Sequence, residues 1–138
     1  MSLMYFEGTS DYVAATPVII TTFEASGSIA AGKLVPFMSA TDQRVYQPPA
    51  TYQGNSSPAG LAIATVANGD PCPVVVWGMC KNIVTGGAFT MLTSYFSISG
   101  SGLAMISGAA SWNKTIGTVG RGITGSSNST ITAFINCM

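Results

Sequence analysis

Short apolar segments alternate along this chain with turns rich in glycine, proline, asparagine and serine, and no apolar stripe recurs at helical spacing. The apolar segments are rich in valine, isoleucine, threonine and aromatic residues, which favour β-strands. Sixteen glycines and seven prolines supply the turns between them. The pattern therefore predicts an all-β protein, built as a sandwich or a barrel.

The strongest strand signal lies at residues 72–80, where nearly every side chain is apolar. Such a strand is apolar on both faces, which predicts a central position covered on both sides. Residues 129–136 instead alternate, which predicts a half-buried strand with Ile131, Ala133 and Ile135 facing the core. Residues 29–37 indicate a turn that leads into a strand, and further strand signals lie at 44–47, 60–66 and 115–121. Turns are predicted at 68–71 and 85–87, a loop at 48–59, and a loop or weak strand pair at 98–111.

The first 25 residues differ from the rest of the chain, because Tyr5, Phe6 and Tyr12 lie among small polar residues without a regular period. We predict an extended N-terminal arm at residues 1–25 and a single β-rich body at residues 26–138. The arm ends in an extended segment at residues 17–23. This segment is either a strand added to the sheet of a neighbouring chain or an ordinary first strand of the domain.

Charged residues make up only 7% of the chain, and five basic and five acidic side chains give a formal net charge of +0. Globular proteins average about 25% charged residues, so neutral polar residues and partner protein are expected to cover the surface. The basic residues are spread along the chain, which argues against nucleic-acid binding. Little repulsion separates copies of such a chain, which suits an assembled state; an ordinary neutral domain is the alternative.

The sequence offers few groups for catalysis or metal binding. It contains no histidine, which removes the usual Ser–His and Cys–His nucleophiles and the commonest zinc sites. Residues 27–33 match part of a phosphate-binding loop, but Leu34 stands where that loop needs serine or threonine. No spacing brings two of the carboxylates together. We therefore predict no enzyme activity, no catalytic residues, no cofactor and no bound metal.

Other features bear on location and on the thiols. We see no signal peptide and no apolar run long enough to cross a bilayer, so no membrane partner is expected. The three cysteines, Cys72, Cys80 and Cys137, include no C-x-x-C pair, which predicts buried reduced thiols. The aromatic residues Trp77, Trp112, Tyr46, Tyr52 and Tyr95 contain enough ring area for a sugar-stacking platform, although the apolar neighbourhood of Trp77 favours burial in the core.

The order of these segments resembles the small capsid decoration (cement) proteins of tailed bacteriophages. The resemblance rests on residues 29–35, 60–62, 68–70, 74–78, 85–87, 116–119 and 130–135, and it leaves residues 1–25 uncovered. It implies a compact, β-tulip-like body and a non-enzymatic protein made in the host cytoplasm. Such proteins bind the capsid exterior, often as homotrimers, and hold neighbouring subunits of the major capsid protein together.

For contact with the capsid or a neighbouring subunit, we predict a set of apolar and aromatic residues in the arm. A strand added to a partner sheet gains backbone hydrogen bonds without needing charge. Deletion of residues 2–20 is then expected to leave a folded body that no longer decorates heads. Two alternatives stay open: another virion component, such as a head-fibre base or tail protein, and a receptor- or glycan-binding β module. The predicted contact residues are Tyr5, Phe6, Tyr12, Ile19, Ile20 and Phe23.

Overall fold

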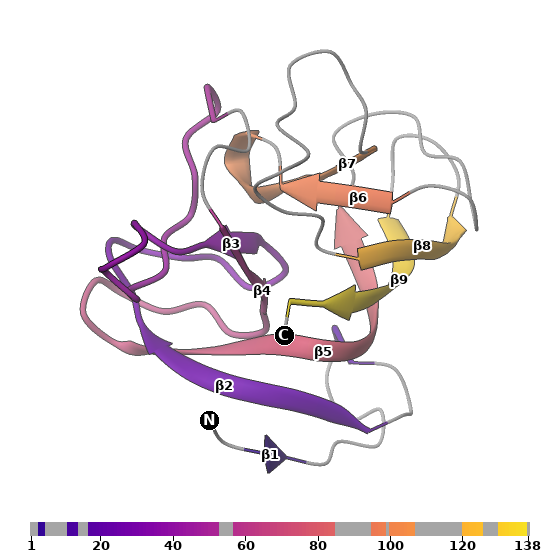
Figure 1. Ribbon diagram of the computed structural model, residues 1–138, viewed down its shortest axis with the longest axis horizontal. Helices are drawn as coiled ribbons and strands as arrows, with labels where there is room; N and C mark the ends of the chain where they lie inside the picture. The colour runs from indigo at the N-terminus through magenta and orange to yellow at the C-terminus, as the bar shows by residue number, and fades with distance from the viewer. Residues whose placement is uncertain are drawn as a thin grey trace.

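The structure, a computed structural model, describes residues 3–4, 11–13, 17–52, 57–84, 95–98, 100–106, 120–125 and 130–137. Within these ranges the chain forms nine strands and one short 3-10 turn, so the all-β prediction is confirmed (Figure 1). The elements are β1 (Leu3–Met4), β2 (Val18–Glu24), β3 (Leu34–Pro36), β4 (Pro58–Ala62), β5 (Pro71–Val84), β6 (Tyr95–Ile98), η1 (Gly100–Gly102), β7 (Ala104–Ile106), β8 (Gly120–Gly125) and β9 (Thr130–Asn136).

The strands form one antiparallel sheet in the order β1-β2-β5-β9-β8-β6-β7, and β3 pairs with β4, which pairs with β5. No pairing between described strands joins β1 to β7. The sheet is therefore open among the described residues and is not the closed barrel that was one of the two expected architectures.

Strand β5 organises this sheet, as its apolar sequence predicts. It is 14 residues long and pairs with β2 along one edge. Its other edge pairs first with β4 and then with β9. Val75, for example, lies opposite both Ile20 of β2 and Leu61 of β4.

Strand β2 lies in this chain's own sheet, where Glu24 pairs with Pro71 and Ile19 pairs with Trp77 of β5. The sequence leaves residues 17–23 open to two interpretations, a strand added to a neighbouring chain or an ordinary strand of this domain. The pairing with β5 corresponds to the second. The division of the chain into an arm at 1–25 and a body at 26–138 stays a prediction.

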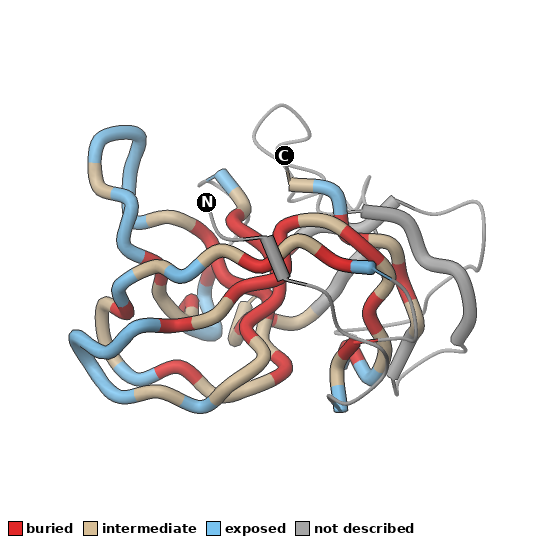
Figure 2. The backbone as a smooth tube through the Cα atoms, turned by 90° about the horizontal axis from the view of Figure 1, so that it is seen from below, coloured by how far each residue is buried: buried red, intermediate tan, exposed pale blue. Residues whose placement is uncertain are grey.

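Two clusters of buried side chains form the core. Ile20, Leu61 and Val75 belong to the first, and Cys72 and Val74 belong to the second. Neighbouring residues of β5 join different clusters because successive side chains of a strand point to opposite faces of the sheet. Figure 2 shows many of the buried positions gathered towards the middle of the described backbone, while many exposed positions lie in the projecting loops.

Strand β9 and the turn before β5 agree with the sequence pattern. Ala133 and Ile135 are fully buried, whereas the alternating residues Thr132 and Phe134 are only half-buried. Gly69 has a φ of +84° at the predicted turn. The amide of Asp70 donates to the carbonyl of Ala67 at 3.1 Å, the hydrogen bond that closes a β-turn.

Two predicted strands are shorter than expected. Residues 44–47 form no ladder, because Val45 makes single bridges to Ala25 on one side and Phe37 on the other. Strand β4 ends at Ala62, and Val66 makes only a bridge to Ile29. The predicted turn at 85–87 and residues 115–119 of the expected strand lie outside the described residues. Of the range 98–111, for which the sequence leaves a loop or a weak strand pair open, β7 pairs with β6, which ends at Ile98.

Candidate partner-binding surface

The structure describes four of the six residues predicted to contact a partner. Tyr5 and Phe6 lie outside the described ranges, and Tyr12, Ile19, Ile20 and Phe23 lie inside them. These four do not form one continuous patch, as the following contacts show. Whether any of them binds a partner stays a prediction.

Tyr12 belongs to a short segment that is fixed against the sheet. Its carbonyl accepts a hydrogen bond from the amide of Lys81 at 2.9 Å, and its hydroxyl donates to the carbonyl of Ala31 at 3.3 Å. A Cβ atom on Gly32 would lie 2.6 Å from the Tyr12 ring, so the glycine makes room for it. The next residue, Val13, is fully buried. The half-buried Tyr12 thus ties this segment to β5 and to the turn before β3.

The three predicted contact residues of β2 point to opposite faces of the sheet. Ile20 is 1% exposed and belongs to the first core cluster. Ile19 and Phe23 are half-buried against the second cluster. The Phe23 ring packs edge-on against Phe37, with 5.0 Å between ring centroids. Of these three residues, only Ile19 and Phe23 therefore keep apolar surface that a partner can reach.

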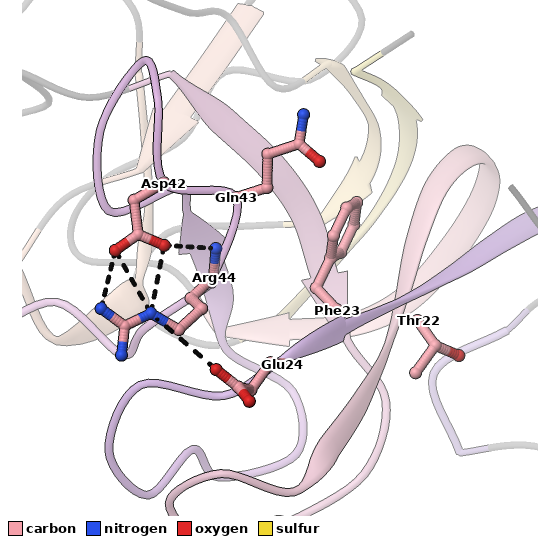
Figure 3. A pocket seen from close by; sticks show the side chains of 6 residues that line it. All are labelled: Thr22, Phe23, Glu24, Asp42, Gln43 and Arg44. Carbon is pink, nitrogen blue, oxygen red and sulfur yellow. Dashed lines mark hydrogen bonds and ion pairs between the residues drawn. The ribbon is translucent and has the colours of Figure 1, made fainter.

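An open hollow of about 430 Å³ lies beside the C-terminal part of β2 (Figure 3). Its walls come from β2 and from the loop that returns to Val45. In Figure 3 the Arg44 guanidinium lies between the carboxylates of Asp42 and Glu24, with the Phe23 ring on the side nearer Gln43. The lining residues are Thr22, Phe23, Glu24, Asp42, Gln43 and Arg44.

A tight turn fixes the loop side of this hollow. The Ser39 hydroxyl oxygen accepts hydrogen bonds from the amides of Thr41, at 3.3 Å, and Asp42, at 3.1 Å. The Asp42 carboxylate in turn accepts one from the amide of Arg44 at 3.1 Å. Side chains of Ser and Asp favour such turns because they bond to backbone groups two or three residues ahead.

Arg44, the single basic side chain among the described residues that line the hollow, pairs closely with one carboxylate and only distantly with the other. Arg44 makes a two-pronged pair with Asp42, with Nη2 to Oδ2 at 2.7 Å and Nε to Oδ1 at 3.1 Å. These hydrogen bonds lower the pKa of Asp42 and raise that of Arg44. Glu24 lies farther away, with its Oε2 atom 3.9 Å from Nε of Arg44 and its side chain 59% exposed. One guanidinium thus faces two carboxylates, and the Glu24 side chain is the more exposed of the two, since that of Asp42 is 32% exposed.

Sequence reasoning missed this hollow. The spacing of Asp42 and Arg44 two residues apart is a local signal for their pairing, but nothing in the sequence places Glu24 beside them. That proximity arises because the backbone amide of Val45 donates to the carbonyl of Glu24 at 3.0 Å. The contact depends on how the loop returns to the sheet.

The aromatic residues form separate edge-to-face pairs. Tyr46 contacts Tyr52 at a centroid distance of 6.4 Å, and Trp77 contacts Phe134 at 4.9 Å. Trp112 lies outside the described residues, as does the side chain of Tyr95. The pairs that are described present no flat stacking platform of the kind considered for sugars.

Trp77 is half-buried, not in the core as its neighbourhood favoured. The pairing of β2 with β5 shifts between Ile19 and Ile20, which lie opposite Trp77 and Val75, so Val76 is an extra residue in β5. Such a bulge changes the face on which the following residues lie. Trp77 therefore shares the face of Ile19 instead of that of Val75.

The thiols are buried, as expected for Cys72 and Cys80, and Cys137 is partly buried against the first core cluster. Burial raises the pKa of Cys72 to about 11 and that of Cys80 to about 12. Across the described ranges, no three histidine, cysteine or carboxylate side chains gather as metal ligands do. None of the helical structure in those ranges is long and apolar enough to cross a membrane.

Comparison with known proteins shows a likeness of fold and none of sequence. No protein family and no curated protein matches the chain in sequence. Among solved structures, the chain is similar to the N base of the head fiber protein gp8.5 of bacteriophage phi29, with a TM-score of 0.57 and 16% identity. The match covers 86% of this chain and 94% of the phage protein chain.

Proposed function

We propose that this chain is a non-enzymatic structural protein of a tailed-bacteriophage virion and that it binds the outer surface of the head. The observation that carries the proposal is the likeness in fold to a phage head-fibre base along 86% of the chain. The small share of charged residues, 7%, and the net charge of +0 support the proposal, because a nearly neutral surface favours association with other protein chains.

The proposed partners are the major capsid protein and further copies of this chain, arranged as a trimer. A capsid decoration protein needs only a modest affinity at each contact, because many copies act together on one lattice. Tyr5, Phe6 and Tyr12 are proposed to contribute to docking together with Ile19 and Phe23, the two residues of β2 that keep accessible apolar surface. Ile20 is buried, so its contribution is proposed to be indirect, through the position of β2.

The test is a binding experiment with heads. The purified protein is mixed with expanded heads of the phage that lack it, the heads are pelleted, and bound copies per head are counted. Saturation at a number set by the capsid lattice is the expected result. A cement role further predicts that decorated heads resist heating better than bare heads. Absence of binding at any concentration would refute a role on the head.

A matched pair of variants tests the predicted docking residues. The double variant Tyr5→Ser/Phe6→Ser is expected to lose head binding, because it removes two aromatic side chains that the proposed interface would bury. The control is Met38→Ser, which removes another large apolar side chain, one that is 39% exposed. If both variants bind heads like the unchanged protein, the proposed aromatic contacts are wrong.

A second candidate, the base of a head fibre, follows from the same likeness in fold. The head-binding experiment separates it from the cement role. A fibre base is expected to saturate at few sites and to leave the heat resistance of the heads unchanged. A cement protein is expected to saturate at many sites and to raise that resistance.

A further inference from the structure

The outer edge of β2 presents backbone groups at the hollow. Thr22 and Glu24 lie opposite Pro73 and Pro71 of β5, and proline has no amide hydrogen to donate. The carbonyl of Pro73 points to the other side, where it accepts from the amide of Ile63 at 3.1 Å. Thr22 is therefore not hydrogen-bonded to β5. In an antiparallel pair, the backbone groups of such a residue point away from the partner strand.

The hydrogen bond of Glu24 supports this orientation. Its carbonyl accepts from the amide of Val45, which lies on the side of β2 away from β5. Thr22 is two residues earlier and has the same orientation, because strand geometry repeats every second residue. Its amide and carbonyl thus face outward, into the hollow that is lined by β2 on one side and by the loop at Asp42–Arg44 on the other.

Within the described ranges, no strand covers this part of the edge. Strand β1 pairs only with Val18 and Ile19, and the backbone of the loop is hydrogen-bonded to β2 only at Glu24. The stretch from Ile20 to Phe23 lies between these two contacts. Exposed strand edges are sites where another chain can add a strand.

The charge beside this edge indicates which strand fits. Arg44 is held by Asp42, so the exposed Glu24 carboxylate gives the hollow an excess of negative charge. Thr22 and Glu24 lie on the same face of β2, and a residue of an added strand opposite Thr22 would be the diagonal neighbour of Glu24. A long basic side chain can span that diagonal.

We propose that the outer edge of β2 at Thr22 binds an extended segment of a partner polypeptide, and that a lysine or arginine of this segment pairs with Glu24. This inference gives the chemistry of one partner segment for the proposed structural role. It can be tested on the isolated protein, so its failure and that of head binding are separate results.

The competing explanation is that Glu24 protects the edge. Native proteins place charged side chains on edge strands to prevent strand addition. In that case an extended peptide does not bind at Thr22, whatever its charge. In the proposed case Glu24 selects among peptides instead of excluding them all.

The experiment titrates the ¹⁵N-labelled full chain with capped synthetic peptides of alternating valine and threonine that carry one central lysine. The expected result is a saturable change in the amide signals of Thr22 and Gln43. A peptide with glutamate in place of lysine is expected to bind about tenfold more weakly. A lysine peptide with N-methyl groups on its backbone is expected to bind at least about fivefold more weakly, because it cannot complete the backbone hydrogen bonds.

Two pairs of variants locate the site. Thr22→Pro removes the outward amide without breaking a bond to β5, and it is expected to weaken binding about fivefold or more. Thr22→Val keeps that amide and is expected to bind as before. Glu24→Lys is expected to reverse the preference, so that the glutamate peptide binds more tightly. The proposal is overturned if the lysine peptide changes no signals near Thr22, if both peptides bind alike, or if Thr22→Pro binds as well as Thr22→Val.

Discussion

Single glycines decide how closely the strands of this protein approach. Gly60 of β4 has a φ of +146°, and a Cβ atom there would overlap the backbone carbonyl of Val75 on β5. Gly78 of β5 is similar, because a Cβ atom would lie 2.6 Å from a methyl carbon of Val18. At both positions the missing side chain lets a neighbouring strand pack against the backbone.

The variant Gly60→Ala is expected to lower the free energy of unfolding by about 3 kcal/mol, from overlap with backbone atoms and an unfavourable φ. The control is Gly69→Ala, where φ is +84° but no atom lies within 4 Å of the added Cβ. It is expected to cost about 1 kcal/mol. Urea unfolding measures both. Equal losses for the two variants would show that close packing at Gly60 contributes little.

Buried thiols predict how stability depends on pH. Burial raises the pKa of Cys72 from 9.0 to about 11. Below pH 9 the thiol is protonated in both states and adds no pH dependence. Above pH 9 the unfolded chain loses the proton first, so the free energy of unfolding falls as the pH rises towards 11, by up to about 1.4 kcal/mol per pH unit.

Urea unfolding between about pH 7 and about pH 10.5 measures this fall. Other groups titrate in the same range, so the matched variant Cys72→Ala isolates the contribution of the thiol. The variant is expected to show a shallower fall above pH 9 than the unchanged chain. Identical slopes would mean that this thiol does not resist ionisation in the folded protein.

At the scale of elements, β2 and the described segment 11–13 both pack along one edge of β5. β2 pairs with β5 over six residues of β2, from Ile19 to Glu24. Val13, which precedes β2 in the chain, forms a β-bridge with Cys80 along the same edge of β5. The side chain of Asn82, from β5, also donates to the carbonyl of Asp11 at 2.6 Å.

Deletion of residues 2–20 is therefore now expected to prevent folding, although the sequence alone favoured a folded remainder. The deletion removes Val13, Val18 and Ile20, which are 0%, 3% and 1% exposed. Each contributes about 2 kcal/mol by burial, against a total stability of about 5–15 kcal/mol for a typical domain.

The shorter deletion of residues 2–10 keeps those three side chains and is expected to remain folded. Circular dichroism and urea unfolding of both truncated chains compare the two outcomes. A cooperative unfolding transition in the chain that lacks residues 2–20 would show that the first half of β2 is dispensable.

At the scale of the whole molecule, few charges are available for long-range attraction. The five basic and five acidic residues are spread over 138 positions. The contact proposed with a partner is therefore expected to depend mainly on apolar surface and backbone hydrogen bonds. Steering by charge, which is strong in proteins with a large net charge or a charged patch, is expected to be weak here.

Head binding is accordingly expected to change by less than about fivefold between about 50 and about 500 mM salt, a range over which exposed charges become largely screened. The pelleting experiment, repeated across this range, measures the change. The single ion pair proposed for Glu24 fits within this limit, because exposed pairs contribute at most about 1 kcal/mol. A steep loss of binding with salt would indicate a charged interface.

The sequence by itself determined the all-β class, the central position of β5, the alternation of β9 and the turn at Gly69. These features depend on local composition and on the two-residue period of strands, which a sequence displays directly. Only the tertiary structure decided the half-buried position of Trp77, the burial of Ile20 and the approach of Glu24 to Arg44. These features depend on the bulge in β5, on the pairing of β2 with β5 and on the path of the loop that returns to Val45. All three arise from contacts between residues far apart in the chain, which local sequence patterns do not reveal.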